Sequence, residues 1–412
     1  MRTTTLLCLT LAVLLLNMAA DWPQFRGPTS NAVAPDADRV PDDLFDMKTG
    51  EGIAWKVDLP GEGASTPIVI GKKIIVTSSD GLKKDRDQDR LYISAYDVDS
   101  GKLLWQRRFQ PTGYTTIHPL GSIANATPAT DGKYLVAVFS SNDVVCLDLD
   151  GNLLWHRGLT YEHPQARHDT GMACSPLLID GAAVIQVENQ GDSFIEAINL
   201  ADGKTRWHIP GKKKTVWTTP NRLPQEDGKD LILLQSSKQL AALDPATGKA
   251  VWKHEIDCNT VASTVVQDGL IYLPARGLNA LKPVGASEGE EPVETVWSQK
   301  KMRSYASSPI VHEGRAYVLK PPSILVCADV KTGKVLWQVR LKGKTWASPV
   351  LAGDRIFTAN QDGLIQAIDI SGKKGKVVAK AEYGEVVLGS PIVVDGALFL
   401  RGERTLTKVS KE

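Results

Sequence analysis

The chain has 412 residues, of which 42% are hydrophobic, and its 48 Lys and Arg residues against 47 Asp and Glu residues give a formal net charge of +1. A chain of this size and composition can bury a large core, and its balanced charge does not favour binding to nucleic acid or to an anionic membrane surface. We therefore expect no nucleic-acid partner.

The first twenty residues differ from the rest of the chain. Arg2 supplies a positive charge, an apolar run extends from Leu6 to Leu16, and small residues follow it. This run is too short to span a bilayer, so the pattern predicts a cleaved signal peptide over residues 1–20. We expect a mature chain from Asp21 that is exported to the periplasm or the extracellular space and does not span the membrane.

Residues 21–47 are interpreted as an N-terminal linker segment, and residues 48–412 as one repeat domain. The phrase "ALDPATGKAVW" at residues 242–252 has close copies that begin at Ala95, Cys146, Ala197 and Cys327. A Ser/Thr-Pro phrase precedes each copy, and its eight anchors are Pro67, Pro128, Pro176, Pro220, Val265, Pro309, Pro349 and Pro391. Most successive anchors lie 40–48 residues apart. A period of this length is typical of β-propeller blades.

Each repeat carries the signals of four antiparallel strands. Apolar runs flank an Asp-Gly turn in "SPIVVDGALFL" from Ser390, which indicates a hairpin. Proline at the start of the first strand favours the inner edge of a blade, where a missing N–H is tolerated. A tryptophan is expected to end the fourth strand and to pack between blades, where an indole buries about 150–250 Å². These blade-packing residues are Trp55, Trp105, Trp155, Trp207, Trp252, Trp297 and Trp337.

The two ends of the repeat region predict a closed ring. The last repeat, from Ser390, has three strands and no tryptophan strand, whereas the strand around Trp55 has no repeat of its own. Pairing the two completes the last blade and removes exposed sheet edges. We predict an all-β, eight-bladed β-propeller of four-stranded antiparallel blades. Seven blades are the alternative if a weak repeat fails to form, either the one at Val265, which lacks proline, or the one at Ser348, which has Ala379 in place of tryptophan.

The cysteines are interpreted as buried free thiols, although an exported protein could form disulfides. Cys146 and Cys327 occupy slots that hold alanine in other repeats, and Cys174 stands in a small slot two residues before Pro176. Free cysteine packs as a small apolar residue. The sequence contains no Cys-x-x-Cys-His motif, so covalent haem is not expected.

The repeated phrase resembles the tryptophan-docking repeat of pyrroloquinoline-quinone (PQQ) propeller proteins, a group that includes quinoprotein alcohol and glucose dehydrogenases and the non-catalytic outer-membrane assembly lipoprotein BamB. The stretch "DWPQFRGPTSN" from Asp21 is similar to the start of secreted PQQ-like repeat proteins. The dehydrogenases imply a pair of adjacent cysteines, which this chain lacks, and a calcium ion, for which Glu188 and Asn189 are candidates. We expect no cofactor, with PQQ and calcium as the alternative.

Candidate binding residues lie in the loops that lead from the fourth strand of one blade to the first strand of the next. Such loops converge on one face of the channel. Trp217 and Trp346 replace small residues there, and could either stack on a ligand or plug the channel. The whole candidate set is Asn125, His168, Trp217, Arg303, Tyr305, Lys344 and Trp346.

No catalytic or metal-binding residue is assigned from the sequence. His163 and His168 share a loop, but no carboxylate or cysteine follows at ligand spacing, so a solvated loop is favoured over zinc. The favoured function is a monomeric, non-catalytic module of the cell envelope that binds a protein or peptide. A PQQ-dependent alcohol or sugar dehydrogenase and a polysaccharide-binding propeller are the alternatives.

Overall fold

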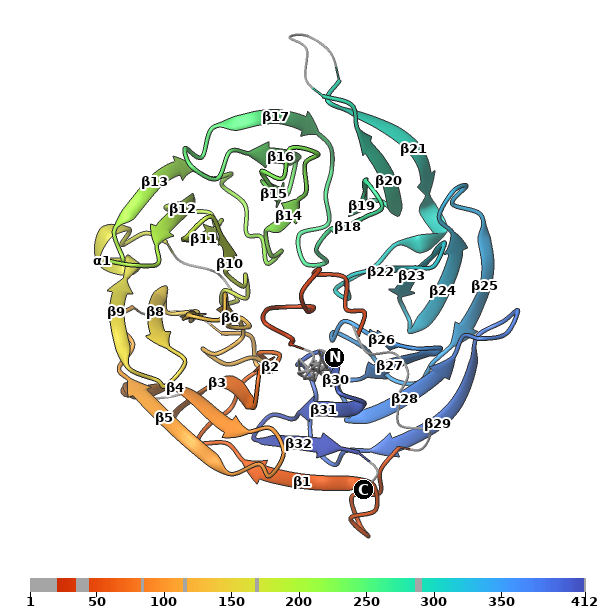
Figure 1. Ribbon diagram of the computed structural model, residues 1–412, viewed down its shortest axis with the longest axis horizontal. Coiled ribbons are helices and arrows are strands. Elements are labelled where there is room, and N and C mark those ends of the chain that lie inside the picture. Colours follow the sequence, from red (N-terminus) through yellow and green to blue (C-terminus); the bar gives the residue numbers. More distant parts are fainter. Residues whose placement is uncertain are drawn as a thin grey trace, which may run out of the picture.

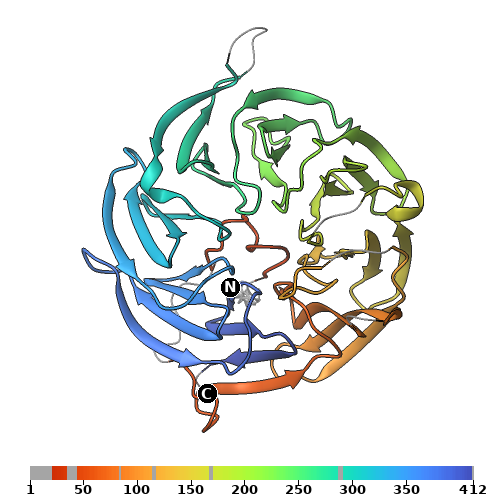
Figure 2. The same cartoon turned by 180° about the vertical axis from the view of Figure 1, so that it is seen from behind.

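The computed structural model describes six stretches of the chain, residues 21–34, 44–82, 85–113, 117–166, 170–285 and 291–410. The predicted signal peptide, residues 1–20, lies outside them. The described residues form eight four-stranded antiparallel sheets arranged as a ring around a central channel (Figures 1 and 2). The prediction of an all-β, eight-bladed propeller is confirmed, and both repeats that were considered weak form complete blades.

In blades 1 to 7 the strands follow the chain from the channel outward, whereas the outer strand of blade 8 comes from the N-terminal part of the chain. Blades 1 to 4 consist of β2 (Ile68–Ile70), β3 (Lys73–Leu82), β4 (Asp85–Asp97) and β5 (Leu103–Phe109); β6 (Ala129–Thr130), β7 (Tyr134–Val138), β8 (Asp143–Asp148) and β9 (Leu153–Gly158); β10 (Leu177–Ile179), β11 (Ala182–Val187), β12 (Phe194–Asn199) and β13 (Thr205–Pro210); and β14 (Asn221–Leu223), β15 (Leu231–Ser236), β16 (Gln239–Leu243) and β17 (Ala250–Glu255).

Blades 5 to 8 consist of β18 (Val265–Gln267), β19 (Leu270–Pro274), β20 (Leu278–Pro283) and β21 (Val293–Gln299); β22 (Ile310–His312), β23 (Arg315–Lys320), β24 (Ile324–Asp329) and β25 (Val335–Arg340); β26 (Val350–Ala352), β27 (Arg355–Ala359), β28 (Leu364–Asp369) and β29 (Lys376–Glu382); and β30 (Ile392–Val394), β31 (Ala397–Arg401), β32 (Thr405–Val409) and β1 (Ile53–Asp58).

Helices contribute little to the described part of the chain. A four-residue α-helix, α1 (Leu159–Glu162), follows β9, and a single 3₁₀ turn, η1 (Lys300–Met302), follows β21. Among the described residues, neither is long and apolar enough to cross a membrane.

Burial explains why middle and outer strands differ in sequence. The second strand of blade 3, β11, reads "AAVIQV" and is buried at every position, because neighbouring blades cover both of its faces. The outer strand of blade 6, β25, reads "VLWQVR" and buries only Trp337 fully. An outer strand therefore keeps polar residues at alternate positions, as the two-residue period of a half-exposed strand requires.

The ring closes through its N-terminal strand, as predicted. β1 pairs antiparallel with β32, so that Ile53 lies opposite Val409 and Trp55 opposite Lys408. The resulting order β1–β32–β31–β30 gives blade 8 its fourth strand. In Figure 1 the orange β1 lies along the outside of the blue β32.

The repeated tryptophans dock on a glycine of the following blade. The indole of Trp207 in blade 3 lies against Gly248 in blade 4, and its Nε1 donates to the carbonyl of Pro245 at 2.8 Å. Equivalent pairs are Trp55–Gly101, Trp105–Gly151, Trp155–Gly203, Trp297–Gly333 and Trp337–Gly375. Contrary to the expectation that the tryptophans end the fourth strands, most are third in theirs, because the strands continue past the docking site.

The four cysteines within the described residues are free thiols, as expected. Cys146, Cys174 and Cys327 are buried, and Cys258 is partly buried. Burial raises the pKa of Cys146 and of Cys327 to about 12. These thiols therefore stay protonated at neutral pH and pack as small apolar groups.

Residues 21–34, here called the floor segment, cross the interior of the ring. Trp22 pairs with Val69 of β2, and Val33 forms a parallel bridge with Leu351 of β26. Between them, the side-chain Oδ1 of Asn31 accepts a hydrogen bond from the N–H of Val311 in β22 at 2.9 Å. Figure 1 shows the segment as the red trace at the centre of the ring. It therefore binds the inner strands of several blades from within the channel.

Candidate functional site

Eight hydroxyl groups form a closed ring where the inner strands begin. The backbone N–H of Thr66 donates to the hydroxyl of Thr127 at 3.0 Å, and the same contact repeats from blade to blade. It ends where the N–H of Ser390 donates back to the hydroxyl of Thr66 at 3.2 Å. This hydroxyl ring consists of Thr66, Thr127, Ser175, Thr219, Ser263, Ser308, Ser348 and Ser390.

The hydroxyl ring corrects the alignment of one repeat. Ser263 takes the ring position of blade 5, and in the other blades the residue after that position is proline. Thr264, not Val265, therefore stands in the proline slot, and β18 begins directly after it. The sequence-based anchor was wrong by one residue, because the missing proline left the apolar run without a fixed start.

A second ring of side chains lies two residues before the hydroxyl ring in each blade. Its members, here called the rim residues, are Ala64, Asn125, Ala173, Trp217, Val261, Ala306, Trp346 and Leu388. All eight line one cavity of about 390 Å³ at the end of the channel, together with seven members of the hydroxyl ring. The corrected alignment explains why Val261, and not Ala262, lines this cavity.

Aromatic side chains enclose the cavity. Trp346 is 37% exposed, and its ring centroid lies 5.2 Å from that of His118 and 6.3 Å from that of Tyr305. Trp217 is held more firmly, because its Nε1 donates to the carbonyl of Gly171 at 2.7 Å. Phe25 of the floor segment also lines the cavity. The tryptophans therefore leave space between them rather than filling the channel mouth.

Four of the seven candidate residues meet at this cavity: Asn125, Trp217, Tyr305 and Trp346. Arg303 and Lys344 are exposed and do not line it. His168 lies outside the described residues. Sequence reasoning missed His118 and Phe25, since neither occupies a repeated slot; their position depends on how an irregular loop and the floor segment fold over the channel.

Among the described residues, the lining of the cavity includes no Asp, Glu, Lys or Arg, and His118 supplies its one imidazole. The nearby Arg26 belongs to the floor segment, is almost fully buried, and donates through Nη2 to the carbonyl of Pro309. Burial lowers the pKa of Arg26 to about 9. The cavity therefore offers aromatic faces, methyl groups and hydroxyl groups instead of ion pairs.

The pair Glu188 and Asn189 lies away from the cavity lining. The carboxylate of Glu188 accepts from the N–H of Lys212 at 2.7 Å, from Ser236 Oγ at 2.9 Å and from Gln186 Nε2 at 2.9 Å. Burial nevertheless raises the pKa of Glu188. Protein donors already satisfy this carboxylate, and the cavity offers neither carboxylate ligands for calcium nor Lys or Arg side chains for the carboxylates of PQQ among the described residues. The described residues therefore do not fit this cofactor.

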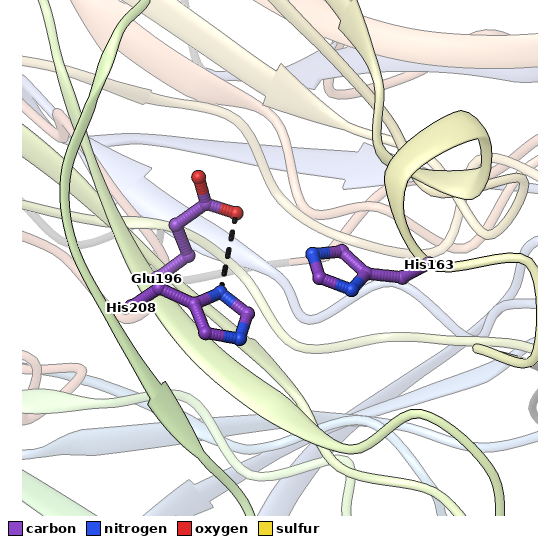
Figure 3. A group of neighbouring side chains, drawn as sticks. All are labelled: His163, Glu196 and His208. Atoms are coloured by element: carbon purple, nitrogen blue, oxygen red, sulfur yellow. Dashed lines mark ion pairs between the residues drawn. The ribbon is translucent and has the colours of Figure 1, made fainter.

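A separate group of side chains lies at the junction of blades 2 and 3. His163 follows α1, whereas Glu196 of β12 and His208 of β13 are directly opposed on paired strands. One ligand atom from each of the three lies within 4.8 Å of the others (Figure 3). Burial and the neighbouring His208 lower the pKa of His163. Of these three residues, only His163 was considered from the sequence, and its supposed partner there was His168.

Removing one hydroxyl from the ring should destabilise the protein measurably. In a Ser175→Ala variant the buried N–H of Thr127 loses its acceptor, which now lies at 3.0 Å. We expect a loss of about 1–3 kcal/mol in the free energy of unfolding, the usual penalty for an unpaired buried donor. Chemical denaturation measures it. Ser100→Ala, in an exposed turn, is the control and should change stability by less than about 0.5 kcal/mol; equal effects would contradict a structural role for the ring.

The closed ring and its cavity define an eight-bladed β-propeller whose channel holds an aromatic site beside an internal floor segment. The chain belongs to the family described as outer membrane protein assembly factor BamB, whose model matches residues 44–192, 92–277 and 289–378. The resemblance to PQQ-like propellers is thereby confirmed. Over 339 residues the chain is 23% identical to the outer membrane protein assembly factor BamB of Moranella endobia (strain PCIT), which covers 79% of each protein.

Solved structures show the same fold. The crystal structure of BamB from Moraxella catarrhalis matches with a TM-score of 0.63 and 16% identity, over 87% of this chain and 97% of that one. The quinohemoprotein alcohol dehydrogenase from Comamonas testosteroni matches with a TM-score of 0.68 and 14% identity, over 96% of this chain and 82% of that one. Because an assembly factor and a dehydrogenase share this fold, function has to be argued from the site.

Proposed function

We propose that this protein is a non-catalytic binding module of the cell envelope, and that the cavity at its channel mouth takes a segment of another protein. The observation that carries the proposal is the composition of the cavity, in which Trp217, Tyr305 and Trp346 surround a space of about 390 Å³ whose described lining includes no Asp, Glu, Lys or Arg. Sites that bind ligands are commonly concave, mostly apolar and about 300–1,000 Å³ in volume. The predicted signal peptide and the relatives named as outer membrane protein assembly factors support the envelope as its location.

The rim residues suit the side chains of a bound peptide, and the hydroxyl ring suits its main chain. An aromatic or aliphatic side chain would pack among the rim residues, where Trp346 and Tyr305 already form an edge-to-face pair. Each hydroxyl of the ring accepts one N–H, and no described residue accepts its own proton, as at Ser175 and Ser348. These protons are available to the carbonyl oxygens of a bound main chain.

A PQQ-dependent dehydrogenase is the competing proposal, since solved quinoprotein dehydrogenases share the fold. The chemistry of the site does not favour it. PQQ carries carboxylates, whereas Arg303 and Lys344, the two cations of the candidate set, do not line the cavity. We therefore expect neither a saturable change in quinone absorbance when PQQ and calcium are added nor dye reduction with alcohols or sugars; turnover would overturn the binding proposal.

The direct test is a fluorescence titration with short peptides taken from outer membrane proteins. Trp346→Ala should weaken binding about tenfold or more, as removal of a central aromatic contact worth over 1 kcal/mol does. Its melting temperature should change little, because Trp346 is 37% exposed. Arg303→Ala and Lys344→Ala are matched controls on the same face and should bind normally. Equal losses in all three variants, or preference for an oligosaccharide series over peptides, would contradict peptide binding in this cavity.

A further inference from the structure

We propose that His163, Glu196 and His208 form a binding site for a zinc-type transition-metal ion at the junction of blades 2 and 3. The site is separate from the channel cavity and shares no residue with its lining. Two imidazole nitrogens and one carboxylate oxygen are the ligands that zinc prefers, whereas calcium and magnesium favour oxygen ligands alone.

The strand register brings two of the ligands together. Glu196 and His208 are direct partners across β12 and β13, so their side chains leave the same face of the blade. Trp207, the neighbour of His208 along the strand, points to the opposite face and docks on blade 4. His208 Nδ1 lies 4.0 Å from Glu196 Oε2. Figure 3 shows this pair joined by the dashed line, with the ring of His163 opposite it.

One oxygen of the Glu196 carboxylate accepts hydrogen bonds, whereas the other accepts none from the described residues. Oε1 accepts from Arg157 Nη1 at 2.9 Å and from the hydroxyl of Thr205. Oε2 is buried, on a residue that is only 1% exposed, and has no hydrogen-bond partner among the described residues. A buried carboxylate oxygen without a donor is costly. The two bonds to Oε1 fix the carboxylate so that Oε2 faces the histidines, which is the arrangement of an oriented metal ligand.

The local charge favours a cation. Glu162, Asp192 and Glu196 are the carboxylates that act on His163. Arg157 is the guanidinium at this site, and it pairs with both Glu162 and Glu196. Three negative groups against one positive group leave an excess of negative charge, which a divalent ion would neutralise.

The geometry requires only a small adjustment. Zinc binds nitrogen and oxygen at about 2.0–2.2 Å, which places tetrahedral ligand atoms about 3.5 Å apart. The three ligand atoms lie within 4.8 Å of one another, and His208 is partly exposed, so rotation of its side chain can close the site. Three protein ligands leave a fourth position open to water. The rings of His163 and His208 are stacked, with centroids 4.9 Å apart and an interplanar angle of 12°, and metal binding would separate this stack.

The test is a zinc titration by calorimetry on the full chain without a histidine tag, after treatment with a chelator. We expect one ion per chain in the wild type. His208→Ala and Glu196→Gln should each weaken binding by about 100-fold or more, since even outer-shell partners of a metal contribute about 10–100-fold. His254→Ala is the matched control, because His254 forms a histidine–carboxylate pair with Glu291 at 3.0 Å without a third ligand among the described residues; its affinity should be unchanged.

A second measurement separates metal binding from folding. Cobalt bound in place of zinc should give visible absorption bands of a four-coordinate site in the wild type and in His254→Ala, but not in His208→Ala, which removes one ligand, on a side chain that is 38% exposed. Melting temperatures without metal should agree among these three proteins. No saturable binding of zinc or cobalt in the wild type, or binding that survives His208→Ala with unchanged affinity, would overturn the proposal.

Discussion

Replacing Gly248 with alanine should destabilise the protein by about 2–4 kcal/mol, through backbone strain and overpacking together. Gly248 has a φ of +69°, which disfavours any side chain. A Cβ atom there would lie 2.6 Å from two ring atoms of Trp207, closer than real Cβ contacts. The indole cannot retreat easily, because Trp207 is buried and its Nε1 is bonded to Pro245. Chemical denaturation followed by tryptophan fluorescence measures the change.

Gly228 supplies the matched control for this prediction. Its φ of +75° is similar, but no atom lies within 4 Å of a Cβ placed there. Gly228→Ala should therefore cost about 1–2 kcal/mol from the backbone alone. If the two variants were equally stable, the contact between the indole and the glycine would have no share in holding blades 3 and 4 together.

Replacing Trp22 with alanine should destabilise the docked floor segment by about 3–5 kcal/mol, as large-to-small changes at buried aromatic residues do. Trp22 is 1% exposed, and its backbone exchanges two hydrogen bonds with Val69, at 2.8 and 3.0 Å. Loosening the segment should also expose the N–H groups that it covers. The N–H of Thr130 donates to Pro23 at 2.9 Å, and that of Leu351 donates to Ala32 at 2.8 Å.

Hydrogen exchange distinguishes a loosened floor segment from global unfolding. In Trp22→Ala the amides of Val69, Thr130 and Leu351 should exchange faster, whereas those of Val184 in β11 and Leu233 in β15, two central strands that are paired on both sides within their own blades, should not. Trp346→Ala is the control for loss of an indole at an exposed position. Unchanged exchange at all three amides would mean that the segment stays docked without Trp22.

Much of the fold could be predicted because each blade repeats the same local chemistry. The glycine and tryptophan of the repeated phrase are the two halves of one contact, as at Gly248 and Trp207, so their recurrence identifies a blade. Closure could be predicted by counting strands, because Trp55 had no blade of its own. The anchor at Val265 was wrong because the alignment relied on proline, whereas the feature that all eight blades share is the hydroxyl group, supplied in blade 5 by Ser263.

In the channel site, the residues that occupy a repeated slot could be predicted, and the others could not. Asn125, Trp217 and Trp346 occupy one slot of the repeat, and all three line the cavity. Arg303 and Lys344 each lie two residues before a lining residue, Tyr305 and Trp346, yet neither lines the cavity, because both stand in irregular loops where side chains do not alternate as they do in a strand. Phe25 could not be predicted, since nothing in its own sequence indicates that the floor segment enters the channel.

The histidine cluster could not be predicted from spacing. Glu196 and His208 become neighbours through the pairing of β12 with β13, and His163 reaches them from the preceding blade. Their separation in sequence therefore matches no metal-binding motif. Only the register of the strands and the contact between blades reveal the group.

The pairing of β1 with β32 has a consequence for the order of events during synthesis. Ile53 emerges from the ribosome early, whereas its partner Val409 is made only after all the intervening blades. Until then blade 8 lacks a strand and the neighbouring sheets have exposed edges, which are prone to aggregation. Contacts between such distant parts of a chain also form slowly. A newly made chain should therefore keep its ring open until β32 has been made.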